Sequence, residues 1–319
     1  MFLSVIRCNS ALFNLALGVS MFALNQASDL HEPWLQFKNL LVRQLAFCLC
    51  SPNTLSSIPP ELELKHAFAL HNTETWTTHF QHYHARLLHL DQHPQELEVF
   101  LQQLKSTRLG LRFEMFIWFW LLDHSYHPYE LLGHSIQKIA GPKTLGELDF
   151  LLRNTESNQI EHWEVALKYY LAERDFSLAY WYGLNRSDTL LRKLNHFSQK
   201  QFQFKDALEY QIEQRFVVLK GQLFLPIEHS QNPIPTWVNS QRRLGCWGSV
   251  IPAQDSAFYR LQRQEWICPQ ADISSETAHW WINGLYQQQD QSHIYMFRNA
   301  PLLSQYFKRE PDKTDIWIN

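Results

Sequence analysis

Fourteen residues from Leu109 to Leu122 (LGLRFEMFIWFWLL) constrain the fold of this chain most strongly. From Phe113 onward, apolar side chains cover every face of the helix that this segment predicts, and such a helix must be buried. Glu114 is its only acid. Because an unpaired buried charge is costly, we expect Glu114 to contact a metal ion or to form an ion pair with Arg108 or Arg112.

The composition supports a folded protein with a large apolar core. Of its 319 residues, 45% are hydrophobic and 14% aromatic, which argues against disorder and allows one large domain or two smaller ones. The formal net charge of -3 argues against a protein that coats nucleic acid without specificity. Five cysteines have spacings that match neither a disulfide framework nor a zinc site, which indicates a reducing cytoplasm. They are Cys8, Cys48, Cys50, Cys246 and Cys268.

Two strands joined by a polar turn are predicted after the buried helix. Glu147 to Arg153 is a short apolar strand interrupted by Asp149, and the polar sequence NTESNQ follows. From Trp163 to Leu171 every second side chain is apolar, with Glu164 and Lys168 on the other side; such alternation is typical of a strand. A rival helical pattern would make Glu164 and Lys168 a surface pair. We favour the strand because it follows another strand and a short turn.

The chain divides into four predicted regions. Residues 1–29 form an apolar extension, residues 30–104 a helical region, residues 105–227 an α/β core, and residues 228–319 a β-rich, tryptophan-containing region packed on the core. The order of elements predicts an α/β fold, with a mixed central sheet flanked by helices.

Hydrophobic periodicity places further elements within these regions. Residues 34–50 predict one amphipathic helix, and residues 74–104 predict one or two more. Residues 185–201 predict a capped and locally basic helix. Residues 215–227 predict two strands separated at Lys220-Gly221.

The N-terminal residues 11–24 (ALFNLALGVSMFAL) are apolar and follow Arg7, as in the hydrophobic part of a signal peptide. The run is too short to cross a bilayer, which takes about 20 apolar residues, so no membrane span is expected. Two interpretations remain open: export or anchoring, and a start assigned too early with initiation at Met21. We favour a cytoplasmic protein.

Two groups of side chains have the chemistry of binding sites, but we interpret both as structural. Clustered histidines lack a cysteine or acid that would complete a zinc site, so we interpret them as a solvated helix surface. Tryptophans in the C-terminal region are able to stack on bases, but we favour buried core aromatics. The histidines are His79, His82, His84, His89 and His93, and the tryptophans are Trp237, Trp247, Trp266, Trp280 and Trp281.

The acidic residues suit metal-dependent hydrolysis of a phosphodiester. That reaction needs a divalent cation to neutralise developing charge and to lower the pKa of an attacking water, and carboxylates suit Mg²⁺. Asp149 and Glu164 would come from adjacent strands, and Glu114 from the preceding helix.

With this order of residues the sequence resembles the PD-(D/E)XK nuclease-like superfamily, whose signature is an acid on one strand and Glu-x-Lys on the next, often with a glutamate on the preceding helix. More narrowly, it resembles a bacterial family, number 1853 among the domains of unknown function. The resemblance implies a restriction-endonuclease-like fold with Mg²⁺ or Mn²⁺ as cofactor. It also implies Asp149, Glu164 and Glu114 as metal ligands and Lys168 as the catalytic lysine. The segments that carry it are VRQLAFCLCSP, RLGLRFEMFIWFWL, LGELDFLL, HWEVALKYYL, residues 185–193 and LKGQLFLP.

The sequence departs from the superfamily signature at the lysine. Ala166 occupies the lysine position, and Lys168 lies four residues from Glu164, which on a regular strand is about 13 Å rather than about 6.6 Å. Lys168 must reach back, or the strand must bulge or turn helical. Lys193 on the following basic helix is the substitute if the lysine has migrated, and Gln199 is placed to assist.

The leading hypothesis is therefore a nuclease that cleaves DNA or RNA with Mg²⁺ or Mn²⁺. The alternative keeps the nuclease-like fold without catalysis, as a binding or interaction module. The displaced lysine and the acidic net charge favour this alternative.

Overall fold

The computed structural model of this chain describes residues 30–227, 232–252, 258–268, 281–288 and 293–298, and the apolar run 11–24 lies outside them. The described helices, with η for 3₁₀, are η1 (Pro33–Gln36), α2 (Leu40–Cys50), α3 (Thr73–Gln92), α4 (Gln95–Gln102), α5 (Leu109–Leu122), η2 (His124–Tyr126), η3 (Leu178–Tyr180), α6 (Leu190–Gln199), η4 (Gln201–Gln203) and η7 (Arg263–Trp266). The described strands are β1 (Ala69–Leu70), β2 (Tyr129–Ala140), β3 (Lys143–Asn154), β4 (Ile160–Ala172), β5 (Trp181–Gly183), β6 (Asp206–Ala207), β7 (Tyr210–Gln211), β8 (Gln214–Pro226), β9 (Gly245–Gly248), β10 (Phe258–Arg260), β11 (Gly284–Gln288) and β12 (Ile294–Phe297).

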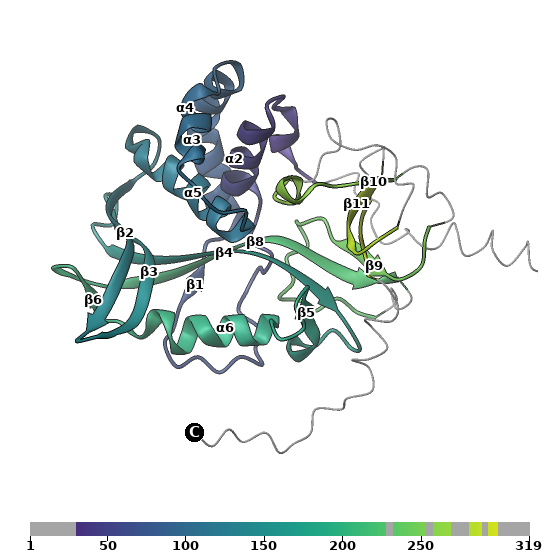
Figure 1. Cartoon of the computed structure of the whole chain (residues 1–319). Coiled ribbons are helices and arrows are strands. Elements are labelled where there is room, and N and C mark those ends of the chain that lie inside the picture. Colours follow the sequence, from purple (N-terminus) through teal and green to yellow (C-terminus); the bar gives the residue numbers. More distant parts are fainter. Residues whose placement is uncertain (1–29, 228–231, 253–257, 269–280, 289–292, 299–319) are drawn as a thin grey trace, which may run out of the picture.

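A mixed sheet forms the centre of the molecule. Its strands lie in the order β10-β11-β12-β9-β8-β4-β3-β2, with β1 paired to β8 and β5 paired to β4. Helices α2 to α5 cover one face of this sheet and α6 covers the other (Figure 1). The predicted α/β class, with a mixed sheet flanked by helices, is confirmed.

The helices on the first face form where the sequence predicts them. Helix α5 has the expected bounds, and its Phe116, Ile117 and Trp120 are at most 1% exposed. The single helix expected over residues 34–50 is split, because the side chain of Asn39 accepts the N–H groups of Leu41 and Val42 and starts α2 there.

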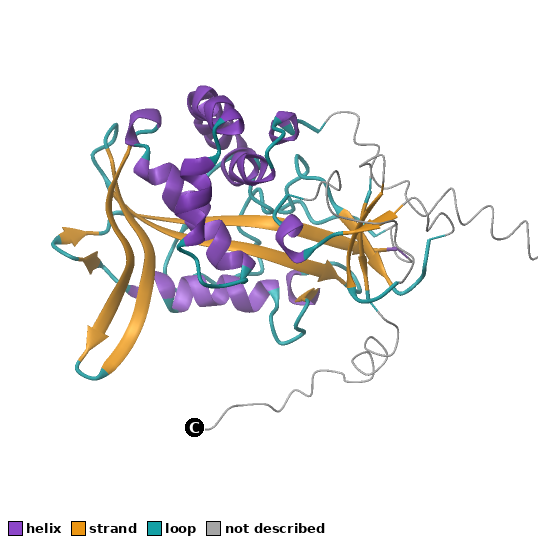
Figure 2. Ribbon diagram, turned by 45° about the horizontal axis from the view of Figure 1, so that its top comes forward, coloured by secondary structure: helices purple, strands orange, loops and turns teal. Residues whose placement is uncertain are grey.

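A three-stranded meander follows α5. Strands β2 and β3 form a long antiparallel hairpin that curves away from the rest of the sheet (Figure 2). Strand β4 then pairs antiparallel with β3 and parallel with β8. Residues 160–172 are therefore a strand, and the rival helical interpretation is wrong for them.

Helix α6 connects β4 to β8 across the second face. Its N-cap is Thr189, whose hydroxyl accepts the N–H of Arg192 at 3.1 Å. The prediction of two strands around Lys220-Gly221 is wrong: β8 is one strand, paired with β4 from Glu161↔Gln214 to Leu171↔Phe224 without a register shift. The pairing continues because Gly221 adopts a φ of +118° that is easy for glycine alone.

The C-terminal strands extend the same sheet. Strand β9 pairs parallel with the end of β8, and β12, β11 and β10 follow it outward. The boundaries proposed at 104/105 and 227/228 remain predictions. Among the described residues, no helix combines the length and the apolar character that a bilayer crossing requires.

The alternation along β4 divides its side chains between two cores. Trp163, Leu167 and Tyr169 face the core that contains α2 to α5. Ala166 and Tyr170 face the core that contains α6. Because side chains of a strand alternate, Glu164 and Lys168 lie on the α6 face.

The interpretation of the histidine cluster is correct in part. His82, His89 and His93 are exposed on α3, and His84 is half-buried. His79 is 4% exposed, packed between Trp120 and Tyr129, and burial lowers its pKa to about 3. A solvated surface is wrong for His79 because its position on the helix falls on the buried stripe with Phe80 and Tyr83.

The tryptophans of the C-terminal region that the structure describes are buried or half-buried. Trp237, Trp247 and Trp266 are buried, as expected. Trp281 is half-buried, with its ring stacked on Tyr286 at 4.2 Å. Trp280 lies outside the described residues.

We expect Gly221→Ala to destabilise the protein by about 2–4 kcal/mol or to prevent folding. A Cβ at this position would lie 1.9 Å from the backbone oxygen of Lys168, and its φ is unfavourable for alanine. Gly110→Ala is the matched control, because nothing lies within 4 Å of its Cβ position in α5, and it should stabilise by about 0.5–1 kcal/mol. Urea unfolding measures both changes. Equal stability of the two variants would contradict the constraint at Gly221.

Candidate functional site

The candidate site is a gap in the pairing of β4. On the edge of β4 opposite β8, β3 pairs only up to Phe150↔Trp163, and β5 begins only at Tyr170↔Gly183. Between them Asp149 takes the role of a strand neighbour, since its Oδ2 accepts the N–H of Val165 at 2.8 Å. This places Asp149 beside Glu164, which are the two acids expected on adjacent strands.

Glu164 is held by three groups and is 1% exposed. Its Oε1 is hydrogen-bonded to Nε2 of His162 at 2.7 Å and accepts the backbone N–H of Asp149 at 3.4 Å. Its Oε2 accepts a hydrogen bond from the Gln201 amide at 2.6 Å. The orientation of this carboxyl group is therefore fixed by β3, by β4 and by η4.

The two acids at the gap have raised pKa values. Burial raises the pKa of Glu164 to about 8, against hydrogen bonding from Gln201 and the positive charge of Lys193. Burial, and then the charge of Glu164, raise the pKa of Asp149 well above its usual value. The negative charge of Glu114 also raises the pKa of both. A cation at the gap would therefore favour the ionised forms of both acids and lower their pKa values.

Lys193 supplies a positive charge next to these carboxyl groups. Its ammonium lies 4.0 Å from the centre of the Phe197 ring on the same helix. Burial lowers its pKa, while the charges of Glu164 and Asp149 raise it. Within the described residues the ammonium forms no ion pair with either acid, but it is near enough for their charges to raise its pKa.

Lys168 is engaged elsewhere. Its Nζ forms an ion pair with Oδ2 of Asp188 at 2.6 Å, in the turn before α6. Strand β4 neither bulges nor turns helical near Leu167, because its register with β8 is continuous there. Ala166, at the lysine position of the superfamily signature, is 6% exposed and packs in the α6 core.

Glu114 is paired neither with Arg108 nor with Arg112. Its Oε1 is hydrogen-bonded to Nε2 of His134 at 2.8 Å, and the His134 ring stacks against Trp118 at 4.2 Å. The expected arginine partner is wrong because α5 turns Glu114 toward β2. There, Ser135 Oγ also donates to it at 3.4 Å.

Two residues that hold Glu164, His162 and Gln201, were not predicted from the sequence. Gln199 donates to Asn195 at 3.4 Å along α6, and Gln201, two residues further on, reaches Glu164 instead. His162 had a detectable signal, because residues two apart on a strand share a face. Gln201 had none, since the end of α6 decides which glutamine turns inward.

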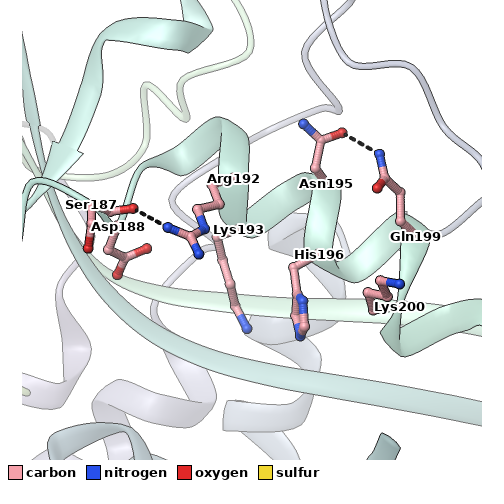
Figure 3. A pocket seen from close by; sticks show the side chains of 8 residues that line it. All are labelled: Ser187, Asp188, Arg192, Lys193, Asn195, His196, Gln199 and Lys200. Atoms are coloured by element: carbon pink, nitrogen blue, oxygen red, sulfur yellow. Dashed lines mark hydrogen bonds between the residues drawn. The ribbon is translucent and has the colours of Figure 1, made fainter. Parts of the chain in front are cut away.

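A shallow pocket of about 450 Å³ borders the site along α6 (Figure 3). Lys193 belongs both to this pocket and to the surroundings of the acids. Among the described residues, no group of three or more His, Cys, Asp or Glu side chains is arranged to hold a metal ion.

Fold and site define a mixed α/β protein with an acidic centre at a break in its sheet. A family model described as Domain of unknown function (DUF1853) matches residues 43–312. The chain therefore belongs to this family, and the narrower resemblance noted in its sequence is confirmed. No curated protein matches the chain, and no solved structure matches it.

The raised pKa of Glu164 predicts a pH-dependent stability in a metal-chelating buffer. Above about pH 4.5 the unfolded chain loses the Glu164 proton, while the folded protein keeps it up to about pH 8. Stability should therefore fall as pH rises through this window, by at most about 1.4 kcal/mol per pH unit from this group. Glu164→Gln should flatten the decline measured by urea unfolding at several pH values. If Glu164→Gln leaves the dependence of the unfolding free energy on pH unchanged, the raised pKa of Glu164 is contradicted.

Proposed function

We propose that this protein is a metal-dependent nuclease of the PD-(D/E)XK type, with a restriction-endonuclease-like core that hydrolyses phosphodiester bonds of DNA or RNA. The observation that carries the proposal is the meeting of Asp149 from β3 and Glu164 from β4 at the gap in the sheet. The order of a glutamate on a helix, an acid on a strand and a glutamate on the next strand supports the superfamily assignment.

The residues at the gap fit Mg²⁺ or Mn²⁺. Asp149, which is half-buried, and Glu164, which is buried, form a hard oxygen donor set. The charge of Glu164 raises the pKa of Asp149, so a bound cation would offset this repulsion. Oδ2 of Asp149 and Oε2 of Glu164 each accept one hydrogen bond, and each carboxylate oxygen has a second lone pair. Mg²⁺ commonly binds through one or two protein carboxylates together with substrate phosphates, so this pair is sufficient. When bound, the metal would neutralise charge on the phosphate and lower the pKa of the attacking water.

The chain's own residues divide the remaining work. We assign Lys193 the role of the group that takes a proton from the water, because it lies close enough to the gap for the charges of Glu164 and Asp149 to act on it, and because burial lowers its pKa toward the range that a base requires. His162 and Gln201 hold the Glu164 carboxyl group in place. Glu114 adds negative charge near the gap and is itself oriented by His134.

The second candidate function is a nuclease-fold binding module without catalysis. The observation that favours it is the set of hydrogen bonds that already occupies both oxygens of Glu164, in a side chain 1% exposed. The alanine at position 166 also favours it. Metal binding and cleavage separate the two candidates.

We place the protein in the cytoplasm. The four cysteines of the described residues are buried and free, as in chains that fold without disulfides in a reducing compartment.

The central test is cleavage of single- and double-stranded DNA and RNA by the purified full chain with Mg²⁺ or Mn²⁺. Asp149→Asn should abolish both cleavage and the Mn²⁺ binding measured by calorimetry, because it removes a charged ligand from the gap. Asp206→Asn removes an equal charge from an exposed carboxylate paired with Lys138 and should change neither. If the native chain cleaves none of these substrates, the nuclease proposal fails and the binding module stands.

The lysine assignment predicts opposite results for two substitutions. Lys193→Met should lower the cleavage rate by roughly 100-fold or more, as loss of a general base does. Lys168→Met should lower it by less than about tenfold, because Lys168 forms a partly exposed ion pair with Asp188 that contributes about 0–1 kcal/mol of stability. Single-turnover rates at equal protein and substrate concentrations measure both. The reverse order would return the catalytic role to Lys168.

A further inference from the structure

The pocket on α6 is built from one continuous stretch of chain. Its lining comes from the turn before the helix and from the helix itself (Figure 3). The lining residues are Ser187, Asp188, Arg192, Lys193, Asn195, His196, Gln199 and Lys200. It is an open groove along the helix, which suits an extended ligand better than a small enclosed one.

The charge of this groove is opposite to that of the chain. Three cationic side chains line it, on Arg192, Lys193 and Lys200, against one carboxylate. That carboxylate, on Asp188, is already neutralised by Lys168 at 2.6 Å. The whole chain has a formal net charge of -3, whereas the lining of this groove contains more cationic than acidic side chains.

The pKa of His196 responds to the positive charges that line the groove. Its pKa is lowered first by burial and then by the positive charges of Lys193, Lys200 and Arg192. Lys193 and His196 project from α6 in the same direction (Figure 3). Asn195 and Gln199 also line the pocket, but they point to the other side of α6 and are hydrogen-bonded to each other at 3.4 Å (Figure 3).

The groove and the acidic gap share one residue. Lys193 lines the groove, and its charge also acts on Glu164 and Asp149. From Lys193 to Lys200 the helix rises about 10.5 Å, so the cationic side chains are distributed along the length of the groove. An anionic chain lying in the groove would therefore lead directly to the gap.

We propose that the α6 groove binds the backbone of a nucleic-acid strand, with Arg192 and Lys200 contacting the phosphates next to the one at the acidic gap. The identity of this ligand rests on the proposed function, but binding and cleavage are separate measurements. The residues make charge contacts with phosphate and no base contact, so the groove holds the strand without reading its sequence.

The test is the salt dependence of oligonucleotide binding by the full chain in a chelating buffer, where cleavage is suppressed. Fluorescence anisotropy with a labelled single-stranded DNA, and with RNA of the same sequence, gives the slope of log K against log salt concentration. Arg192→Gln/Lys200→Gln should weaken binding and reduce the slope by about 1.4, since each lost single-strand phosphate contact removes about 0.7.

Lys105→Gln/Arg108→Gln is the matched control. It removes the same charge from exposed residues before α5, which lies on the other face of the sheet (Figure 1), and it should leave the slope unchanged. Equal loss of slope in both double variants would overturn the proposal, because it would show a response to net charge alone. Absence of binding by the native chain would also overturn it.

The two proposals fail in distinguishable ways. Loss of slope in Arg192→Gln/Lys200→Gln without any cleavage by the native chain supports the groove and overturns the nuclease. Cleavage by the native chain with an unchanged slope in this variant supports the nuclease and overturns the groove. Thermal unfolding of both double variants checks that they are folded.

Discussion

The gap on one edge of β4 is the constraint on which the site depends. A buried strand needs partners for its backbone N–H and C=O groups. On β4, six residues, 164–169, lie between the last residue paired with β3 and the first residue paired with β5. The carboxylate of Asp149 satisfies one of these backbone groups by accepting a hydrogen bond from the N–H of Val165. The same geometry brings the half-buried Asp149 next to the buried Glu164, and the pKa values of both are raised. The two acids therefore lower the stability of the fold at the place where the sheet is incomplete, as is common for functional sites.

The parallel pairing of β4 and β8 brings the remaining groups to this gap. Two parallel strands that are neighbours in a sheet require a crossover connection, and here the connection includes α6, which crosses the face on which Glu164 and Lys168 lie. The start of the helix places Asp188 next to Lys168, its middle places Lys193 near the acids, and its end places Gln201 on Glu164. One helix therefore separates the two lysines into different environments.

The regularity of β4 explains why Lys168 lies far from Glu164, unlike the lysine of the PD-(D/E)XK signature that the sequence resembles. Eleven consecutive residues pair in register with β8, so Lys168 stays about 13 Å along the strand from Glu164. The close approach of Gly221 to the Lys168 backbone holds this register. In the proposed nuclease, a lysine from α6 takes the place that Ala166 leaves.

Local patterns in the sequence predicted several elements and both acids of the pair. Periodicity is a local property, so it was enough to predict α5 and the strand character of residues 163–171, and the short turn between two strands was enough to predict the adjacency of Asp149 and Glu164. It failed where the deciding interaction joins distant residues. Only the tertiary structure decided that Glu114 meets His134, that Lys168 meets Asp188, and that Gln201 rather than Gln199 reaches Glu164. These choices depend on how α5 and α6 pack on the sheet, which no local pattern encodes.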